Sequence, residues 1–248
     1  MPPCCCWCWL RRGTYAWLTA QSSLTNNFTT AGINHPTTNP DNPDQPIPDD
    51  KAKVNGNLTE TNWVADSKLA PGVSVPKNPN VGIGKGSENA YVYVFVKNET
   101  ASAGTADSKT TYFTINKGWK AVEATAVEGE PTHYLGGLFV YVGNETEATP
   151  LIASKTEDKW TGELFSNVTT PKETEQKDFA KDAKMTVNCF VYAADSTTEG
   201  SAASAEAAAK DWLRTCSNPT PSTEIPVRSP PPFSGRDLGP PLIDDWRT

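Results

Sequence analysis

The sequence predicts a mainly β fold that ends in one α-helix, and three observations lead to this prediction. Between Lys51 and Ala194, apolar runs alternate with turn-forming residues at the spacing of strands. The chain is rich in Thr, Val and aromatic residues, which favour strands, and its polar character is typical of an extracellular β-protein. The alanine-rich stretch Ser201–Leu213 favours a helix, which a preceding Ser or Thr can cap. With 248 residues, the chain can bury a substantial core.

The expected strands are short runs of apolar and β-branched residues that are bounded by Gly, Pro, Asn or Asp. We expect strands at Lys53–Thr59, Ala90–Lys97, Thr110–Asn116, Trp119–Val127, Gly137–Val142, Pro150–Ser154 and Met185–Ala194.

The run Ala90–Lys97 differs from the others because both of its faces are apolar. Aromatic residues occupy one set of alternating positions and valines occupy the other: Tyr91, Tyr93 and Phe95 against Val92, Val94 and Val96. A strand with two apolar faces is central and is covered on both sides. One cover is the core. The other can be the helix, a loop or a strand from a neighbouring copy.

The segment that leads into this strand contains Pro71-Gly72, which predicts a turn that redirects the chain. Pro79 cannot donate a ladder hydrogen bond, so the lead-in is expected at a sheet edge. The glycines in Gly82–Ser87 fit neither phosphate-binding motif, and the stretch is interpreted as a hairpin turn.

Two proline-rich stretches and an unusual N-terminus mark the domain limits. Asn34–Asp50 has five prolines and is expected to be a loop, while Arg214–Thr248 has eight and is expected to be a disordered tail. In residues 1–12 the apolar residues precede the basic ones, the reverse of a secretory signal, so we interpret them as an aberrant leader remnant. The sandwich domain is expected to span residues 13–213.

The six cysteines do not suggest a disulfide framework. Four of them are crowded near the N-terminus without the spacing of a zinc site: Cys4, Cys5, Cys6 and Cys8. Cys189 lies two positions from Val187 and two from Val191 along an expected strand, so all three share one face. This predicts a buried thiol on the aliphatic face of the strand.

Charge and motif content argue against several functions. The net charge of −7 disfavours nucleic-acid binding, and no apolar run has the roughly 20 residues that a membrane span needs. The histidines, His35 and His133, form no zinc-protease motif, and no nucleophile-elbow motif occurs. Glu157 and Asp158 lie in a polar stretch and are expected to be solvated. We therefore expect no catalytic, cofactor-binding or metal-binding residues.

An ordered series of motifs resembles one known family. The series begins with "GTYAWLTAQSSLTNNFTTAGI" and continues through "TETNW", "LAPGVSVPKNPNV", "NAYVYVFVKN", "YFTINKGWKAV", "GGLFVYV", "TPLIASKT" and "LFSNVTTP". It closes with "MTVNCFVYAADS" and the alanine-rich helix, so that it covers about residues 13–213. In this order the motifs resemble the TasA/camelysin-type proteins of Gram-positive bacteria, which a dedicated signal peptidase processes.

The resemblance implies a jelly-roll-like antiparallel β-sandwich that is secreted to the cell surface and self-assembles into biofilm-matrix fibres. The expected partner is another copy of the chain, with other matrix proteins or the cell wall as further candidates. Some family members are described as metallo-endopeptidases, an alternative that the missing zinc motif weakens. A monomeric surface-binding sandwich, or adhesin, is the third alternative.

Two sets of site residues follow. Thr14 and Ala16 form the small-x-small pattern of a signal-peptidase site, which predicts cleavage after Ala16. The mature N-terminus, residues 17–30, is extended and Thr-rich, and the proline-rich loop that follows is expected to let it reach outward. We predict that it is a donor strand that pairs with the next subunit, with four apolar residues as anchors: Trp17, Leu18, Leu24 and Phe28.

Overall fold

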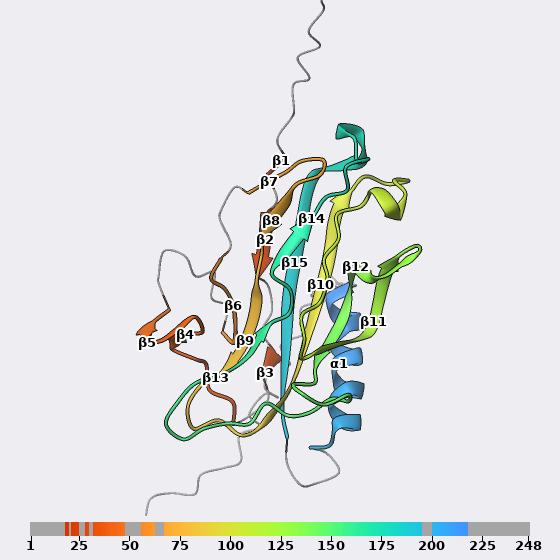
Figure 1. Cartoon of the computed structure of the whole chain (residues 1–248). Helices are drawn as coiled ribbons and strands as arrows, with labels where there is room; N and C mark the ends of the chain where they lie inside the picture. Colours follow the sequence, from red (N-terminus) through yellow and green to blue (C-terminus); the bar gives the residue numbers. More distant parts are fainter. Residues whose placement is uncertain are drawn as a thin grey trace, which may run out of the picture.

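The main sheet contains the longest strands of the protein (Figure 1). The computed structural model describes residues 18–19, 21–24, 28–29, 32–47, 56–62, 67–194 and 200–217, and for residues 18–29 it describes the backbone alone. The strand order is β11 (Trp119–Val127), β12 (Glu130–Tyr141), β10 (Ala90–Ala101), β15 (Phe179–Ala193) and β2 (Gln21–Leu24). A short strand, β3 (Phe28–Thr29), also pairs with β15. Neighbouring strands are antiparallel, except that β2 and β3 run parallel to β15.

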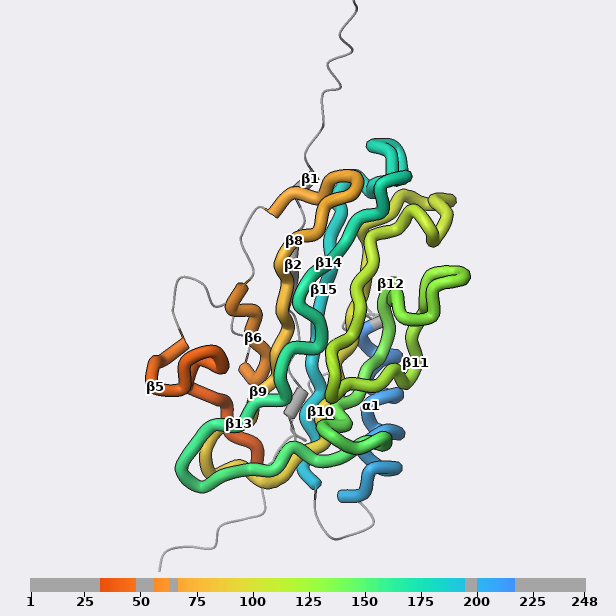
Figure 2. Tube along the Cα trace, viewed as in Figure 1, coloured from red at the N-terminus to blue at the C-terminus, as the bar shows by residue number. Residues whose placement is uncertain are grey.

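A second β layer packs against one face of the main sheet. It contains β13 (Lys159–Glu163), β9 (Pro79–Ile83) and β6 (Leu58–Glu60) in that order, and the pair β14 (Asn167–Thr169) and β8 (Ser74–Pro76). Two further pairs flank it: β1 (Leu18–Thr19) with β7 (Lys68–Leu69), and β4 (Thr38–Asn39) with β5 (Asn42–Pro46). Short 3-10 helices occur at Asp107–Lys109 (η1) and Gln176–Asp178 (η2). In the tube view, β14 of the second layer lies in front of β15 of the main sheet (Figure 2).

The core confirms the two-faced character of β10. Val92, Val94 and Val96 point into the cluster between the layers, together with Leu58 and Val81 of the second layer. The aromatic positions face the other way and pack under the helix α1 (Ala202–Ser217), whose Ala205, Ala209 and Trp212 are buried against them. The outer cover of the central strand is therefore the helix. The expected fold class is confirmed: the described chain is mainly β, a sandwich with one helix.

Several elements were predicted closely. Trp119–Val127 is a strand with the expected bounds, and the strands expected at 90–97, 137–142 and 185–194 overlap longer ones, with Val142 and Ala194 one residue past the observed ends. The helix begins one residue after Ser201, whose Oγ accepts the N–H of Ser204 at 3.3 Å as an N-cap does. It continues to Ser217, past the boundary expected at Leu213, because Arg214–Ser217 contain no proline.

Three predicted strands were wrong in extent. In the first, Lys53–Thr59, the described residues Gly56 and Asn57 form a turn, and the strand β6 begins only at Leu58. Thr110–Asn116 contributes only single bridges, Tyr112 to Thr169 and Phe113 to Tyr134, and Pro150–Ser154 contributes only the bridge from Leu151 to Ala90. The first two bridges nevertheless link β14 of the second layer to β12 of the main sheet. They close one flank of the sandwich.

The predicted place of the proline lead-in was also wrong. β9 is the central strand of its sheet, with β13 on one side and β6 on the other. Pro79 is tolerated there because it is the first residue of the strand, and its carbonyl accepts the N–H of Leu164 at 2.8 Å. The turn at Gly82–Ser87 is not a hairpin either, since β9 and β10 belong to different layers.

Cys189 is buried on the aliphatic face of β15, as predicted, and forms no disulfide among the described residues. Burial raises the pKa of this thiol to about 12, and the thiolate is the reactive form. In a background with Cys4, Cys5, Cys6, Cys8 and Cys216 changed to Ser, a thiol reagent should label Cys189 only as fast as the protein unfolds. Fast labelling of native protein, compared with denatured protein, would contradict this prediction.

Candidate assembly edge

The described parts of the N-terminal segment, residues 18–19, 21–24 and 28–29, lie along the flank of the sandwich that is opposite the Tyr112 and Phe113 bridges. β1 pairs antiparallel with β7, with Leu18 opposite Leu69. β2 and β3 then pair parallel with β15 in the main sheet. The segment thus begins against a strand beside the second layer and ends against the main sheet. This flank lies between β15 of the main sheet and the side of the second layer where β6 and β7 lie. We call it the seam.

β15 is the strand that the segment completes. On one side it pairs with β10 along almost its whole length, from Phe179 to Ala193. On its other side, within the described chain, it pairs only with β2 at Lys184–Val187 and with β3 at Phe190–Val191. Without the N-terminal segment, a long central strand would therefore become a sheet edge with unpaired N–H and C=O groups.

The described ladders between the segment and β15 are short. β2 pairs with Lys184–Val187 and β3 pairs with Phe190–Val191. Short ladders open at lower cost than long ones, so this segment is suited to exchange.

The structure places three of the four predicted anchors on this segment. Leu18 lies in β1, Leu24 in β2 and Phe28 in β3. Trp17 and the predicted cleavage site at Ala16 lie outside the described residues, as do residues 1–12 and 218–248. The donor-strand role stays a prediction, because pairing within one chain is also what a monomer would form before assembly.

Asp158, which was expected to be solvated, instead holds the start of the proline-rich loop. One carboxylate oxygen accepts the N–H groups of Thr37 at 2.6 Å and Thr38 at 2.9 Å, and the other accepts the N–H of Lys85 at 2.9 Å. Burial alone would raise the pKa of Asp158, but these hydrogen bonds outweigh it and hold the pKa below its usual range. Asp158 therefore pins two distant loops together.

The chain is fixed to the domain from Gly32 onward. The carbonyl of Gly32 accepts the N–H of Glu88 at 2.9 Å, and the N–H of Asn34 donates to Ser87 Oγ at 2.9 Å. The described part of the loop also contains the exposed β4–β5 hairpin. We expected this loop to let the N-terminal segment reach outward. Its described part is instead held to the domain. Any departure of that segment must begin before Gly32.

Replacing Asp158 by alanine should lower the free energy of unfolding by about 2 kcal/mol at neutral pH, because several N–H donors lose a charged acceptor. The pKa of Asp158 is depressed in the folded state, so its contribution is complete above the unfolded pKa of about 3.9 and is lost as pH falls through the folded value. Thermal unfolding of both proteins from neutral to strongly acidic pH measures the difference. Asp158→Asn, which cannot ionise, is the control. A wild-type advantage that persists unchanged in acid would refute the assignment.

A buried ion pair joins β6 to the residues between β8 and β9. Lys77 Nζ contacts Glu60 Oε1 at 2.6 Å, and the two side chains are 2% and 0% exposed. Glu60 is opposite Pro79 in the β6–β9 ladder, and Lys77 lies two residues before Pro79, between β8 and β9. Lys77 is also held by its backbone, whose N–H donates to Ser166 O at 3.1 Å. Charged side chains are almost never this buried unless they are paired.

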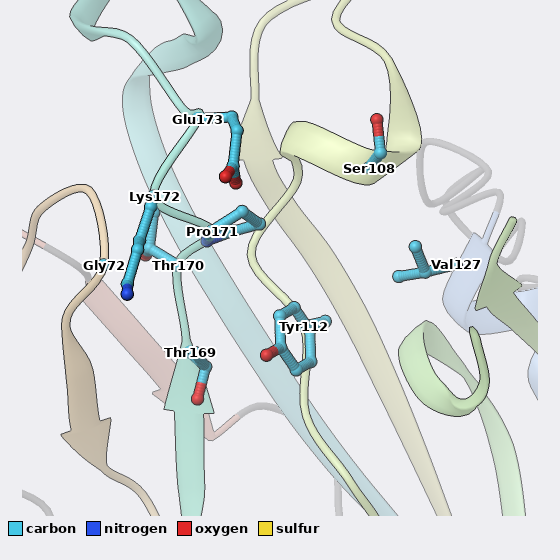
Figure 3. Close-up of a pocket in the computed structure, with 9 residues that line it drawn as sticks. All are labelled: Gly72, Ser108, Tyr112, Val127, Thr169, Thr170, Pro171, Lys172 and Glu173. Atoms are coloured by element: carbon cyan, nitrogen blue, oxygen red, sulfur yellow. The ribbon is translucent and has the colours of Figure 1, made fainter. Parts of the chain in front are cut away.

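A surface pocket of about 270 Å³ opens beside Tyr112 (Figure 3). In the figure the Tyr112 ring lies between Thr169 and Lys172 on one side and Ser108 and Val127 on the other. Tyr112 stacks on His133 with ring centroids 4.2 Å apart. The pocket has a mixed apolar and polar lining that is open to solvent.

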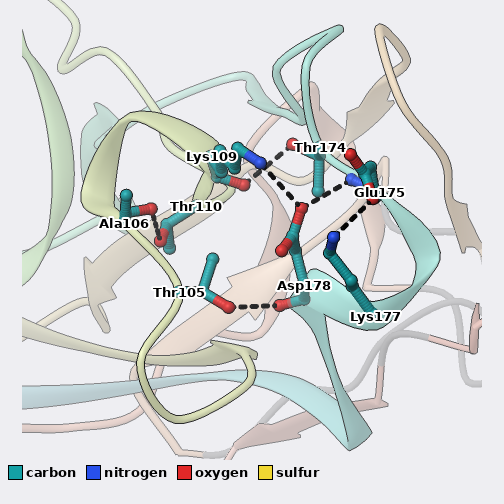
Figure 4. Close-up of polar contacts among 8 residues, drawn as sticks. All are labelled: Thr105, Ala106, Lys109, Thr110, Thr174, Glu175, Lys177 and Asp178. Carbon is teal, nitrogen blue, oxygen red and sulfur yellow. Dashed lines mark hydrogen bonds and ion pairs between the residues drawn. The ribbon is translucent and has the colours of Figure 1, made fainter.

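Asp178 ties the two 3-10 helices together near this pocket (Figure 4). Its carboxylate accepts the N–H of Glu175 at 2.8 Å and pairs with Lys109 Nζ at 3.6 Å, and its carbonyl accepts the hydroxyl of Thr105 at 3.1 Å. The backbone hydrogen bond from Glu175, together with Lys109, holds the pKa of Asp178 below its usual range. These contacts have a structural role at the tip of the sandwich.

In the described part of the chain, no three His, Cys, Asp or Glu side chains are grouped so that they could hold a metal. No helix within that part has the length and apolar character needed to cross a membrane. Comparison with protein-family models, with curated proteins and with solved structures found no match. The family resemblance therefore remains a prediction.

Sequence reasoning missed two features of this region, Asp158 and the Glu60–Lys77 pair. Asp158 lies 120 positions from Thr38 in the sequence, and its neighbours Glu157 and Lys159 form an ordinary exposed ion pair. Nothing local distinguishes the two acidic residues. For Lys77 a signal did exist: it occupies the position two residues after the buried Val75, which on a strand predicts the same face.

Proposed function

We propose that this protein is a secreted structural subunit that polymerises head to tail into extracellular fibres of the biofilm-matrix type. The observation that carries the proposal is the seam, where residues 18–29 complete the outer side of β15 through two short ladders. The motif series that resembles the TasA/camelysin-type proteins, and their location at the surface of Gram-positive bacteria, support the same conclusion.

Strand addition supplies the physical mechanism. The backbone hydrogen bonds between residues 21–24 and 28–29 and β15 are the same whether the segment comes from its own chain or from another copy. Exchange therefore costs no net ladder bonds, and higher protein concentration favours the intermolecular form.

The geometry of such a contact leads to a filament. Each copy would give its N-terminal segment to one neighbour and receive a segment from another, so the two contacting surfaces are different. Contacts of this heterologous kind build open chains unless their rotation closes a ring. A head-to-tail fibre follows from one exchanged strand per subunit.

A cysteine pair across the ladder tests whether the strand is exchanged. Ser23 is the register partner of Thr186, and adjacent strands bring Cα atoms within disulfide range. We expect that Ser23→Cys/Thr186→Cys, oxidised after assembly, forms bonds between chains and gives a ladder of oligomers on a non-reducing denaturing gel. Oxidised before assembly, the same protein should be locked as a monomer that forms fibres only after reduction.

The matched control is Glu99→Cys/Lys184→Cys, because these partners lie on β10 and β15, neither of which is exchanged, and so stay within one chain. Both variants are made with Cys4, Cys5, Cys6, Cys8 and Cys216 replaced by Ser, and fibres are counted by electron microscopy. If the assembled Ser23→Cys/Thr186→Cys protein gives bonds only within chains, the exchange mechanism is wrong. If no fibres form under any condition, the proposed function is wrong.

A further inference from the structure

Two large hydrophobic side chains are exposed among the described residues, and neither is explained by the fold. Ile152 is 62% exposed and Val73 is 40% exposed. Ile152 lies beside the start of β10, because its neighbour Leu151 forms the bridge to Ala90. Val73 adjoins the surface pocket, since its neighbour Gly72 is part of the pocket lining.

Ile152 and the pocket lie at opposite ends of β10. The pocket-lining Ser108 follows the far end of this strand, in η1, and β10 is 12 residues long, so its two ends are about 35 Å apart. In Figure 1, the loop that leads into β13 lies at the bottom of the molecule, and the loop that follows β14 and forms one pocket wall lies at the top. Ile152 therefore cannot enter the pocket of its own chain, but it can enter the pocket of a second copy.

Hydrogen bonds on both sides of Ile152 hold it as a fixed projection. The N–H of Leu151 donates to Ala90 O at 2.7 Å, and the N–H of Ala153 donates to Asn89 Oδ1 at 2.9 Å. Because the backbone here is already ordered, little conformational entropy is lost when the side chain enters a pocket.

The pocket has the size and the lining for one aliphatic side chain. Its volume of about 270 Å³ is just below the roughly 300–1,000 Å³ of sites that enclose whole small molecules. The Tyr112 ring, Pro171 and Val127 supply apolar surface to the lining. An inserted isoleucine would be removed from water by these groups, and Val73 lies close enough to the pocket to be covered by the same partner.

The charges beside the two surfaces are complementary. Lys155 is exposed three positions after Ile152, and Glu173 is exposed at the pocket rim. In Figure 3 the Glu173 side chain points toward the Tyr112 side of the pocket, whereas the ammonium group of Lys172 lies along the wall beside Gly72. A copy that inserts Ile152 would therefore bring a lysine to a rim that presents a carboxylate, and this attraction favours one orientation of the partner.

We propose that Ile152 of one copy inserts into the Tyr112 pocket of a second copy, with Lys155 facing Glu173 at the rim. The two contacting surfaces differ, so the contact is heterologous and can repeat from copy to copy. One inserted side chain is far smaller than a standard interface, so the contact is weak between dilute monomers. The inference rests on the proposed function in this respect, because the fibre keeps copies close enough for the contact to form.

Two proteins with one introduced cysteine each test the contact: Ser108→Cys at the pocket rim and Thr156→Cys beside Lys155. All native cysteines except the buried Cys189 are replaced by Ser, and one protein carries a tag so that the three cross-linked products differ in size. The proteins are mixed, assembled and treated with a bis-maleimide cross-linker. We expect the mixed product to exceed either product of two identical chains by about tenfold or more, because burying an isoleucine side chain is worth about that factor.

Substitutions in one partner at a time show which groups produce this excess. Ile152→Asn in the Thr156→Cys protein should abolish it, whereas the control Ile152→Val should keep most of it. Lys155→Glu in the same protein should lower the excess, and Glu173→Lys in the Ser108→Cys protein should then restore it. Ile152 is exposed, so these variants are expected to fold normally.

Equal amounts of the three products, or an excess that survives Ile152→Asn, would overturn the proposal. If fibres with exchanged strands form and the excess is absent, this inference fails and the proposed function stands. If no fibres form, the proposed function fails, and the same mixture at high protein concentration decides this inference. There, an excess that depends on Ile152 supports the contact and its absence overturns it.

Discussion

Replacing Lys77 by methionine is expected to lower the free energy of unfolding by about 3–5 kcal/mol, because Glu60 would remain buried without its cation. The two groups are 2.6 Å apart and almost fully buried, so water cannot take the place of the lost ammonium group. Urea denaturation of Lys77→Met against the wild-type protein measures the effect as a lower midpoint with a similar slope.

Two further variants separate the burial of a lone charge from the loss of side-chain volume. Glu60→Leu/Lys77→Met removes both charges and should recover most of the lost stability, since apolar replacements of buried pairs are often neutral or stabilising. Lys159→Met breaks the Glu157–Lys159 contact, which has a similar 2.7 Å distance but is exposed, and should change stability little. If Lys77→Met and Lys159→Met are equally mild, burial of the pair does not have the energetic role assigned to it.

The part of the fold that could be predicted from sequence is the part governed by local periodicity. The alternation of aromatic residues and valines in Ala90–Lys97 fixed β10 as a strand buried on both faces, and alanine content indicated the helix that covers it. Strand order could not be predicted in this way. Pro79 illustrates why: its missing N–H excludes only one hydrogen bond, and as the first residue of β9 it leaves the rest of the strand free to pair on both sides.

The candidate site could be predicted only in outline. Leu18, Leu24 and Phe28 were recognised from an extended, Thr-rich segment with spaced apolar residues, and all three lie on strands at the seam. Asp158 was not recognised, because its role depends on loops that the fold brings together from far apart in sequence. A sequence indicates that a carboxylate is present but not which backbone N–H groups will surround it.

Deleting residues 17–30 is expected to abolish fibre formation while leaving a folded β-sandwich. The deletion removes the strand that β15 would receive from a neighbour, so the outer side of β15 loses its ladder from Lys184 to Val191. The ladders from β15 to β10 and from β10 to β12 do not involve the deleted residues. We therefore expect a monomer by analytical ultracentrifugation, with the circular dichroism of a β protein and a lower melting temperature.

Adding the missing strand as a peptide completes the test. A synthetic peptide of residues 17–30 should bind the deleted protein, raise its melting temperature as a ligand of the native state does, and leave it monomeric, because the peptide carries no further domain. The same peptide added to the intact protein should cap growing fibres and shorten them. A peptide with the same composition in scrambled order is the control, since it cannot match the ladder register. If the deleted protein still forms fibres of normal length, the donor strand is not residues 17–30 and the head-to-tail mechanism built on them fails.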